Sequence, residues 1–157
     1  MSYFPDMGHV SMVASGKHVR AIGWLSSNQP YTTGDVSADF IRRLKEFAAR
    51  SAESAEELYF GAFGGFHTCE FCRRVRGIGN FGVPRDSLLF IAPEMIVHYI
   101  EHHGYAPPHE FVEAVLHAPL PATPEYASAV AVFRQRHIDF LNALRKGSRG
   151  CESFTEL

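Results

Sequence analysis

The sequence contains no run of about 18 apolar residues, so no segment of it is expected to span a membrane. Its first residues lack the basic start and the apolar stretch of a secretory signal peptide. Cysteines are few as well: the chain has 3, an odd number that makes a poor disulfide framework. These absences predict a cytoplasmic protein with no membrane partner.

Neither sign of charge dominates, and the motifs of several enzyme classes are missing. The formal net charge is −2, which gives no sequence-independent attraction to nucleic acid, so a nucleic-acid partner is not expected. The G-x-S-x-G, H-E-x-x-H and P-loop motifs are all absent. Basic residues gather in two places, which we interpret as solvated faces: Arg73, Arg74 and Arg76, and then Arg134, Arg136, Arg145, Lys146 and Arg149.

What the chain does have is enough apolar material for one domain with its own core. Hydrophobic residues make up 46% of its 157 residues, and 13 of them are phenylalanines. We therefore expect a single domain over residues 1–157, with an irregular lead-in over residues 1–18 and a flexible tail over residues 147–157.

The hydrophobic pattern predicts an α+β fold, in which a small antiparallel sheet is combined with about four helices. Strands are expected from His18 to Leu25, from Leu58 to Phe66 and from Leu88 to Ile91, with a hairpin after the cysteines. Helices are expected from an N-cap at Ser37 to about Arg50, from Pro93 to Gly104, after Pro107 and Pro108, and from Pro124 to about Lys146. An apolar stripe marks the last helix: Tyr126, Val130, Phe133, His137, Phe140, Leu141 and Leu144.

Cys69 and Cys72 form a C-x-x-C pair, and two thiolates at this spacing on a tight turn can both reach one metal ion. A redox-active pair would instead sit at the N-terminus of a helix, which lowers the pKa of the first thiol. Here glycines and arginines follow the pair. The pattern therefore favours a metal site over thiol redox chemistry.

Histidines that could complete such a site lie downstream, on the helix expected to end at Gly104. His98 follows Cys72 by 26 residues, and C-x2-C followed by H-x3-H or H-x4-H is the ligand order of a Cys2His2 zinc site. Spacing leaves the fourth ligand open. His102 shares a helix face with His98, and His103 lies about 140° away around an ideal helix. His67, two residues before the first cysteine, is a further candidate for a ligand or for a hydrogen-bond donor to one.

Three segments of the chain resemble an uncharacterised family of small bacterial proteins. They are GGFHTCEFC, GNFGVP and LFIAPEMIVHYIEHHGYAPPHEFVEAV, and together with Gly23 to Leu25 and Pro30 to Gly34 they spread over roughly residues 20–116. The family shares a G-x-H-x-C-x-x-C segment, a G-x-x-x-V-P-like strand and an A-P-x-x-I-x-H-Y-I-x-x-H-x-Y-x-P-P-x-x-F helix pair. Its shared positions are matched by His67, Cys69, Cys72, His98, His103, Tyr105, Pro107 and Pro108.

The resemblance leaves His102 outside the family's pattern and so selects His103 as the fourth ligand. The family has no assigned activity, so it supports the site and implies no reaction. The metal ligands expected are Cys69, Cys72, His98 and His103, in a finger-like site that joins a hairpin to a helix and binds Zn2+.

Three functional hypotheses follow from these residues. The first is a zinc-binding domain of unassigned activity with a closed, structural Cys2His2-type site, acting through a protein partner. The second is a zinc-dependent hydrolase with water as the fourth ligand and Glu70 or His67 assisting. The third is a thiol redox protein that uses Cys69 and Cys72 and retains no metal.

Overall fold

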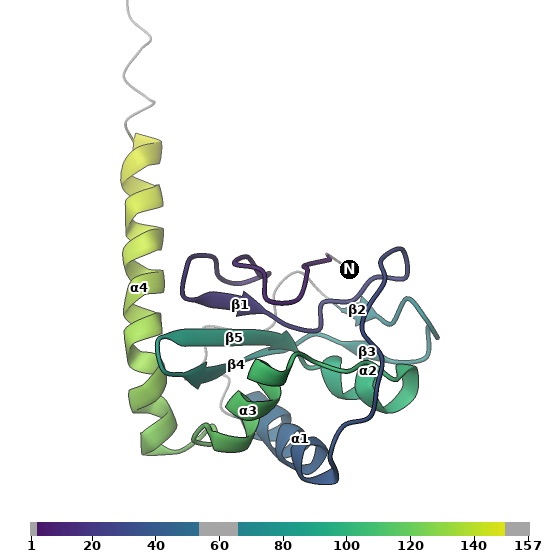
Figure 1. Ribbon diagram of the computed structural model, residues 1–157. Coiled ribbons are helices and arrows are strands. Elements are labelled where there is room, and N and C mark those ends of the chain that lie inside the picture. The colour runs from purple at the N-terminus through teal and green to yellow at the C-terminus, as the bar shows by residue number, and fades with distance from the viewer. Residues whose placement is uncertain (1–2, 54–65, 150–157) are drawn as a thin grey trace, which may run out of the picture.

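The computed structural model describes residues 3–53 and 66–149, and within them the chain is an α+β domain (Figure 1). Its elements in chain order are β1 (Val19–Ala21), α1 (Ala38–Glu53), β2 (His67–Thr68), β3 (Arg76–Gly77), β4 (Asn80–Arg85), β5 (Leu88–Pro93), α2 (Ile96–His103), α3 (His109–His117) and α4 (Pro124–Arg149). Small sheets and four helices in the described residues confirm the predicted fold class. The strand expected from Leu58 to Phe66 lies, apart from Phe66, outside the described residues.

The larger sheet has three strands in the order β1-β5-β4. β4 and β5 form an antiparallel hairpin of six residue pairs, and β1 lies parallel to β5 with Val19 opposite Leu89. The parallel neighbour was not foreseen from the sequence, because a parallel pair is made across a long crossover and leaves no local turn signal. The lead-in covers the outer edge of β1, where Met7 N–H donates to the Ala21 carbonyl at 2.8 Å.

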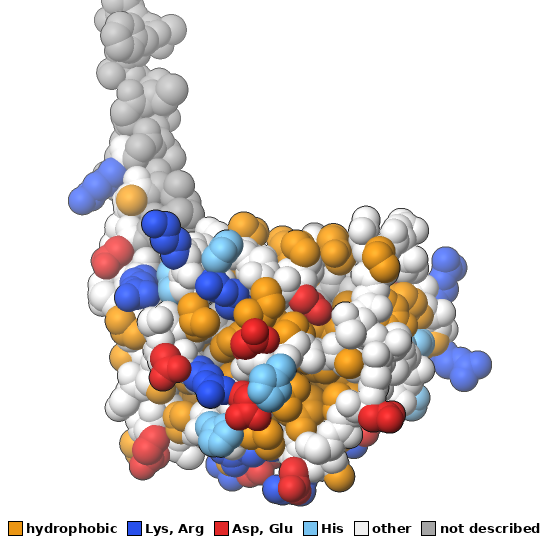
Figure 2. All heavy atoms as spheres, viewed as in Figure 1, with side chains coloured by type: hydrophobic (Ala, Val, Ile, Leu, Met, Phe, Trp, Pro, Cys, Tyr) orange, Lys and Arg blue, Asp and Glu red, His pale blue; other side chains and the backbone are white. Residues whose placement is uncertain are grey.

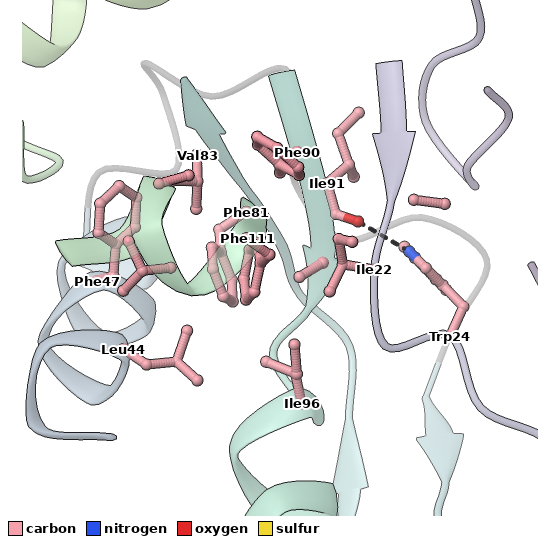
Figure 3. Close-up of a cluster of buried hydrophobic side chains, with 14 of the residues drawn as sticks. Ile22, Trp24, Leu44, Phe47, Phe81, Val83, Phe90, Ile91, Ile96 and Phe111 are labelled. Atoms are coloured by element: carbon pink, nitrogen blue, oxygen red, sulfur yellow. Dashed lines mark hydrogen bonds between the residues drawn. The ribbon is translucent and has the colours of Figure 1, made fainter. Parts of the chain in front are cut away.

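The core lies between this sheet and the helices α1 and α3 (Figure 3). The Ser37 hydroxyl accepts a hydrogen bond from the Phe40 N–H at 3.2 Å, which confirms the predicted N-cap of α1. Residues of α1 at helical spacing, Leu44 and Phe47 among them, are fully buried. Trp24 is buried as well, and its indole N–H donates to the Ile91 carbonyl at 3.1 Å. Large aromatic side chains therefore supply much of the buried surface, as the composition suggested.

Two predicted element boundaries were wrong. Pro93 does not begin a helix but ends β5 opposite Asn80, and α2 begins only at Ile96. The strand is prolonged because the Glu94 N–H donates to the Gly79 carbonyl at 2.9 Å, which continues the pairing past the proline. The first strand is much shorter than predicted, and Gly23, with φ of 71°, lies in the segment where the chain leaves β1.

The long helix α4 packs on the body through buried residues of its first half (Figure 1). Tyr126, Val130 and Phe133 are buried, and the Tyr126 hydroxyl donates to the Gly82 carbonyl of β4 at 2.7 Å. The second half of α4 extends away from the sheet and ends at Arg149, beyond the predicted end at Lys146. The predicted stripe also included Phe140, Leu141 and Leu144, whose side chains lie outside the described part of the chain. No helix in that part is long and apolar enough to cross a membrane.

Candidate metal centre

The two cysteines lie in the turn of a short hairpin made by β2 and β3. His67 pairs with Gly77 in this hairpin. Inside the turn, the Cys69 N–H donates to the Val75 carbonyl at 2.9 Å, and the Arg73 N–H donates to the Cys69 carbonyl at 2.9 Å. Arg73 has φ of 57°, the left-handed conformation that lets the chain reverse directly after Cys72. This tight turn over residues 69–73, called the knuckle below, places both sulfur atoms on the side that faces α2.

Helix α2 supplies two imidazoles that meet the knuckle. The Nε2 atom of His98 lies 3.4 Å from the Cys72 Sγ, and the Nε2 atom of His103 lies 3.4 Å from the Cys69 Sγ. His103 is the last residue of α2, and Gly104 follows it as a C-cap with φ of 65°. The predicted glycine C-cap is therefore confirmed. His103 therefore reaches the cluster from the C-terminal end of α2, where the helix stops.

The four donor atoms lie close enough together to share one metal ion. The two histidine Nε2 atoms lie 3.2 Å apart, and all four ligand atoms lie within 4.8 Å of one another. Zinc bonds of about 2.3 Å to sulfur and about 2.0–2.1 Å to nitrogen imply sulfur–nitrogen edges of about 3.6 Å and nitrogen–nitrogen edges of about 3.3 Å. The cluster of Cys69, Cys72, His98 and His103 therefore fits a metal ion.

The other candidate ligands do not belong to this cluster. In the part of the chain that the structure describes, the group of possible metal ligands has these four members, without His67 or His102. His102 is exposed, and its ring centre lies 5.0 Å from that of His98. His67 lies on β2 and is half-buried. Sequence spacing had left His102 open as a ligand, because residues four apart share a helix face.

The surroundings of the cluster favour the protonation states that bind metals. The backbone N–H of Arg74 hydrogen-bonds to the Cys72 thiol and lowers its pKa, with smaller contributions from Cys69, from the Val75 N–H and from the Arg74 charge. Burial, followed by the neighbouring histidines, lowers the pKa of both His98 and His103. A thiolate and a neutral imidazole are the forms that coordinate a metal.

Phe71, inside the C-x-x-C turn, packs against the helix that carries the histidines. Its ring centre lies 5.1 Å from that of His103 and 5.9 Å from that of Tyr99. Tyr31 also packs against Phe71, with ring centres 5.4 Å apart. The turn is therefore held to α2 by aromatic contacts as well as by the cluster.

The carboxylate of Glu70, the other residue inside the turn, is hydrogen-bonded to the loop that follows β1. Its carboxylate accepts hydrogen bonds from the Ser27 N–H at 2.9 Å, the Ser26 hydroxyl at 3.0 Å and the Ser27 hydroxyl at 3.1 Å. These bonds, chiefly the one from the Ser27 N–H, lower the pKa of Glu70 to about 2. A carboxylate held in this way is a weak general base.

Glu94 has a role that the sequence did not reveal. It lies between β5 and α2, and its carboxylate accepts a hydrogen bond from the Ile78 N–H. An added Cβ at Gly77 would lie 2.8 Å from the Glu94 Oε1 atom. The glycines on either side of Ile78 are the signal that a group approaches the backbone there.

A hollow of about 570 Å³ opens beside the cluster, between α1, β3 and α2. Ala48 and Ala52 of α1 form one wall, and His98 and His102 of α2 form another. The hollow therefore reaches one of the four residues of the cluster.

Fold and site together define an α+β domain in which a C-x-x-C hairpin and a helix with two histidines form a Cys2His2-like cluster. The chain belongs to the family described as Domain of unknown function (DUF7919), whose model matches residues 2–116. This membership confirms the resemblance to an uncharacterised family. The match ends inside α3, so α4 lies beyond it. No curated protein and no solved structure matches the chain.

Proposed function

We propose that this chain is a zinc-binding structural domain in which Cys69, Cys72, His98 and His103 bind one Zn2+ ion. The observation that carries the proposal is the mutual distance of the four donor atoms, all within 4.8 Å. Two thiolates and two imidazoles are a typical zinc set, because softer sulfur ligands select zinc over magnesium or calcium. The ion would join the β2–β3 hairpin to α2.

A structural role fits this donor set better than a catalytic one. Four protein ligands leave no position for water, which is the mark of structural zinc sites. The hydrolase hypothesis needs one donor to withdraw and a base to stand near the metal. Glu70 is bound to Ser26 and Ser27 and has a pKa of about 2, so it is poorly suited to that task. The hollow beside His98 is a feature that would favour a substrate site.

The thiol redox hypothesis has less support than either metal hypothesis. Cys69 and Cys72 lie between two strands of a hairpin and not at the first turn of a helix. These thiols therefore lack the helix dipole that lowers the pKa of the first cysteine in thiol redox proteins. Instead, each sulfur faces an imidazole nitrogen at 3.4 Å.

A domain of this kind would act through a protein partner in the cytoplasm. The surface of the β2–β3 hairpin supports this part of the proposal, because it exposes 65% of Phe66 and 37% of Val75. Arg76 lies over the Phe66 ring at 5.0 Å. Exposed aromatic and arginine side chains are the residues that protein interfaces favour.

The test is metal content, measured by elemental mass spectrometry on the wild type and three variants. We expect one zinc per chain in the wild type and in His102→Ala, and little or none in Cys72→Ser and His103→Ala. His102→Ala is the matched control, because it removes a neighbouring histidine that lies outside the cluster. Cobalt substitution should give the visible absorption of a tetrahedral thiolate site in the wild type.

Other outcomes would favour a different hypothesis. Full zinc occupancy in His103→Ala would mean that three protein ligands suffice, and would favour the hydrolase. A wild type that binds no metal and cycles between dithiol and disulfide would contradict the zinc proposal and favour redox chemistry.

A further inference from the structure

The second half of α4 forms a basic arm, defined here as residues 134–149. It has five basic residues and one acidic residue, Asp139, so its formal charge is +4. The whole chain has a net charge of −2, and the rest of the chain therefore has a charge of −6. Residues 3–53 and 66–133, which form the described body, contain 12 acidic and 10 basic residues and so carry a charge of −2. The arm and the body therefore have opposite net charges, and the arm points away from the body (Figure 1).

One face of the arm combines an exposed apolar residue with two arginines. Ile138 is 43% exposed. Arg134 is one helical turn before it and Arg145 two turns after it, so the three residues share a face of the helix. Arg145 is exposed and Arg134 is half-buried. Lys146, by contrast, lies about 100° away from Arg145 around the helix.

The body has a hollow whose lining is both acidic and apolar and so complements the arm, and we call it the acidic hollow. It has a volume of about 390 Å³ and lies between the β4–β5 turn and α3. Leu88 and the buried ring of Phe90 line it, together with the carboxylates of Asp86, Glu110 and Glu113. Acidic and histidine side chains lie over α3, with a basic side chain beside them and apolar surface between them (Figure 2).

The two basic groups that touch the acidic hollow do not cancel its charge. Arg85 pairs with Asp86 at 4.0 Å, with side chains that are 40% and 91% exposed. His109 also lines the hollow and stands in the first turn of α3. Glu113 pairs with His117 at 3.6 Å, a contact that is ionic only when the imidazole is protonated. Exposed pairs of this kind are weak and exchange partners readily.

Charge selects a second copy of this chain as the occupant of the acidic hollow. Two arms side by side would place cations against cations, since the arm has only one acidic residue. A nucleic acid would be attracted by the arm but repelled by the three carboxylates of the acidic hollow. A second copy offers the arm a surface of opposite charge with an apolar centre.

We propose that the arm of one copy docks into the acidic hollow of another, with Ile138 against Leu88 and Phe90 and with Arg134 and Arg145 beside Glu110 and Glu113. If each copy gives its arm to the other, the contact closes as a dimer. This dimer is independent of the metal centre, because neither surface contains a residue of the cluster.

The experiment is sedimentation equilibrium of the full chain at low and high salt, with a charge-swap series. The wild type should be a dimer that weakens as salt rises. Arg134→Glu/Arg145→Glu and Glu110→Arg/Glu113→Arg should each raise the dimer Kd by about tenfold or more, since like charges would then face each other. The combined four-residue variant should return to within about threefold of the wild type, because the pairs are restored with reversed sign.

Single variants of the arm give the matched control. Arg145→Glu should weaken the dimer, whereas Lys146→Glu changes the net charge equally on a different helix face and should have a much smaller effect. Circular dichroism melts of each variant identify any that fail to fold. A wild type that stays monomeric at every concentration and salt would overturn the proposal. So would a dimer that both double variants leave intact, or one that the four-residue variant fails to restore.

Discussion

The molecule contains two β-hairpins that are held together in different ways. The β4–β5 hairpin has strands of six residues, and most residues of both strands are buried. The β2–β3 hairpin has strands of two residues, and of those four residues Gly77 alone is buried. The first is a normal part of the core, whereas the second buries too little apolar surface to be stable alone.

The difference indicates where the metal centre contributes to stability. The β2–β3 hairpin is attached to α2 by the cysteine–histidine cluster and by the Phe71 ring. The Glu94 carboxylate, between β5 and α2, also accepts from the Ile78 N–H directly after β3. None of these is a strand pairing. The larger sheet needs no such attachment, because Phe81, Val83, Phe90 and Ile91 are buried within the core. We therefore expect the two hairpins to respond differently to the same perturbations.

The largest expected effect is that of removing the metal ligands. Cys69→Ser, or chelation of the wild type, should abolish zinc binding and lower the Tm by about 10 °C, as expected for loss of a ligand present at about a thousand times its Kd. Hydrogen exchange should then become fast at Cys69 and stay slow at Phe90. A Cys69→Ser protein that contains no metal and melts like the wild type would contradict the structural role.

The second largest effect is expected from weakening the β4–β5 hairpin instead of the β2–β3 hairpin. Phe90→Ala removes a ring that is 1% exposed and should destabilise the domain by about 3–5 kcal/mol, measured by denaturant unfolding. The folded variant should still bind one zinc per chain. Phe66→Ala is the control, since Phe66 is 65% exposed and its truncation should change the free energy of unfolding by less than about 0.5 kcal/mol. Equal losses in both variants would contradict the assigned core.

A smaller effect is expected where the hairpin meets Glu94. In Gly77→Ala the new Cβ would lie 2.8 Å from the Glu94 Oε1 atom and 2.9 Å from the Met95 Cγ atom. The resulting displacement should cost about 1–3 kcal/mol and weaken zinc binding. Gly34→Ala is the control, because its Cβ would meet only the Ala106 Cβ, at an ordinary 3.5 Å. If the zinc affinity is unchanged in Gly77→Ala, the Glu94 contact does not support the metal centre.

The smallest effect is that of Glu70→Gln. The amide keeps an oxygen that can accept from the Ser27 N–H but loses the charge, in a position where solvent screens it. We expect a loss of about 0.5 kcal/mol by denaturant unfolding and unchanged zinc content. Glu46→Gln removes a comparable surface carboxylate that pairs with Arg50 and serves as the control. A loss of several kcal/mol would show that the turn depends on this loop contact rather than on the cluster.

Much of this arrangement could be read from local patterns. The cap at Ser37, the end of α2 at Gly104 and the buried face of α1 follow from capping chemistry and helical periodicity within a few residues. The boundary at Pro93 was wrong because the pairing that extends β5 comes from Gly79, on another strand. The parallel placement of β1 beside β5 joins residues about 70 positions apart, and no local pattern encodes it.

By itself, the sequence determined that a C-x-x-C pair precedes a helix with several histidines, because ligand chemistry and spacing are visible in the letters. It left the choice between His102 and His103 open, and only the resemblance to the family selected His103. The tertiary structure decided that His103 faces Cys69 and that His102 does not join the cluster, because α2 ends at that residue and meets the knuckle there. It also decided that Glu70 is bound to Ser27 and that Glu94 supports the hairpin, since both contacts join elements far apart in the chain.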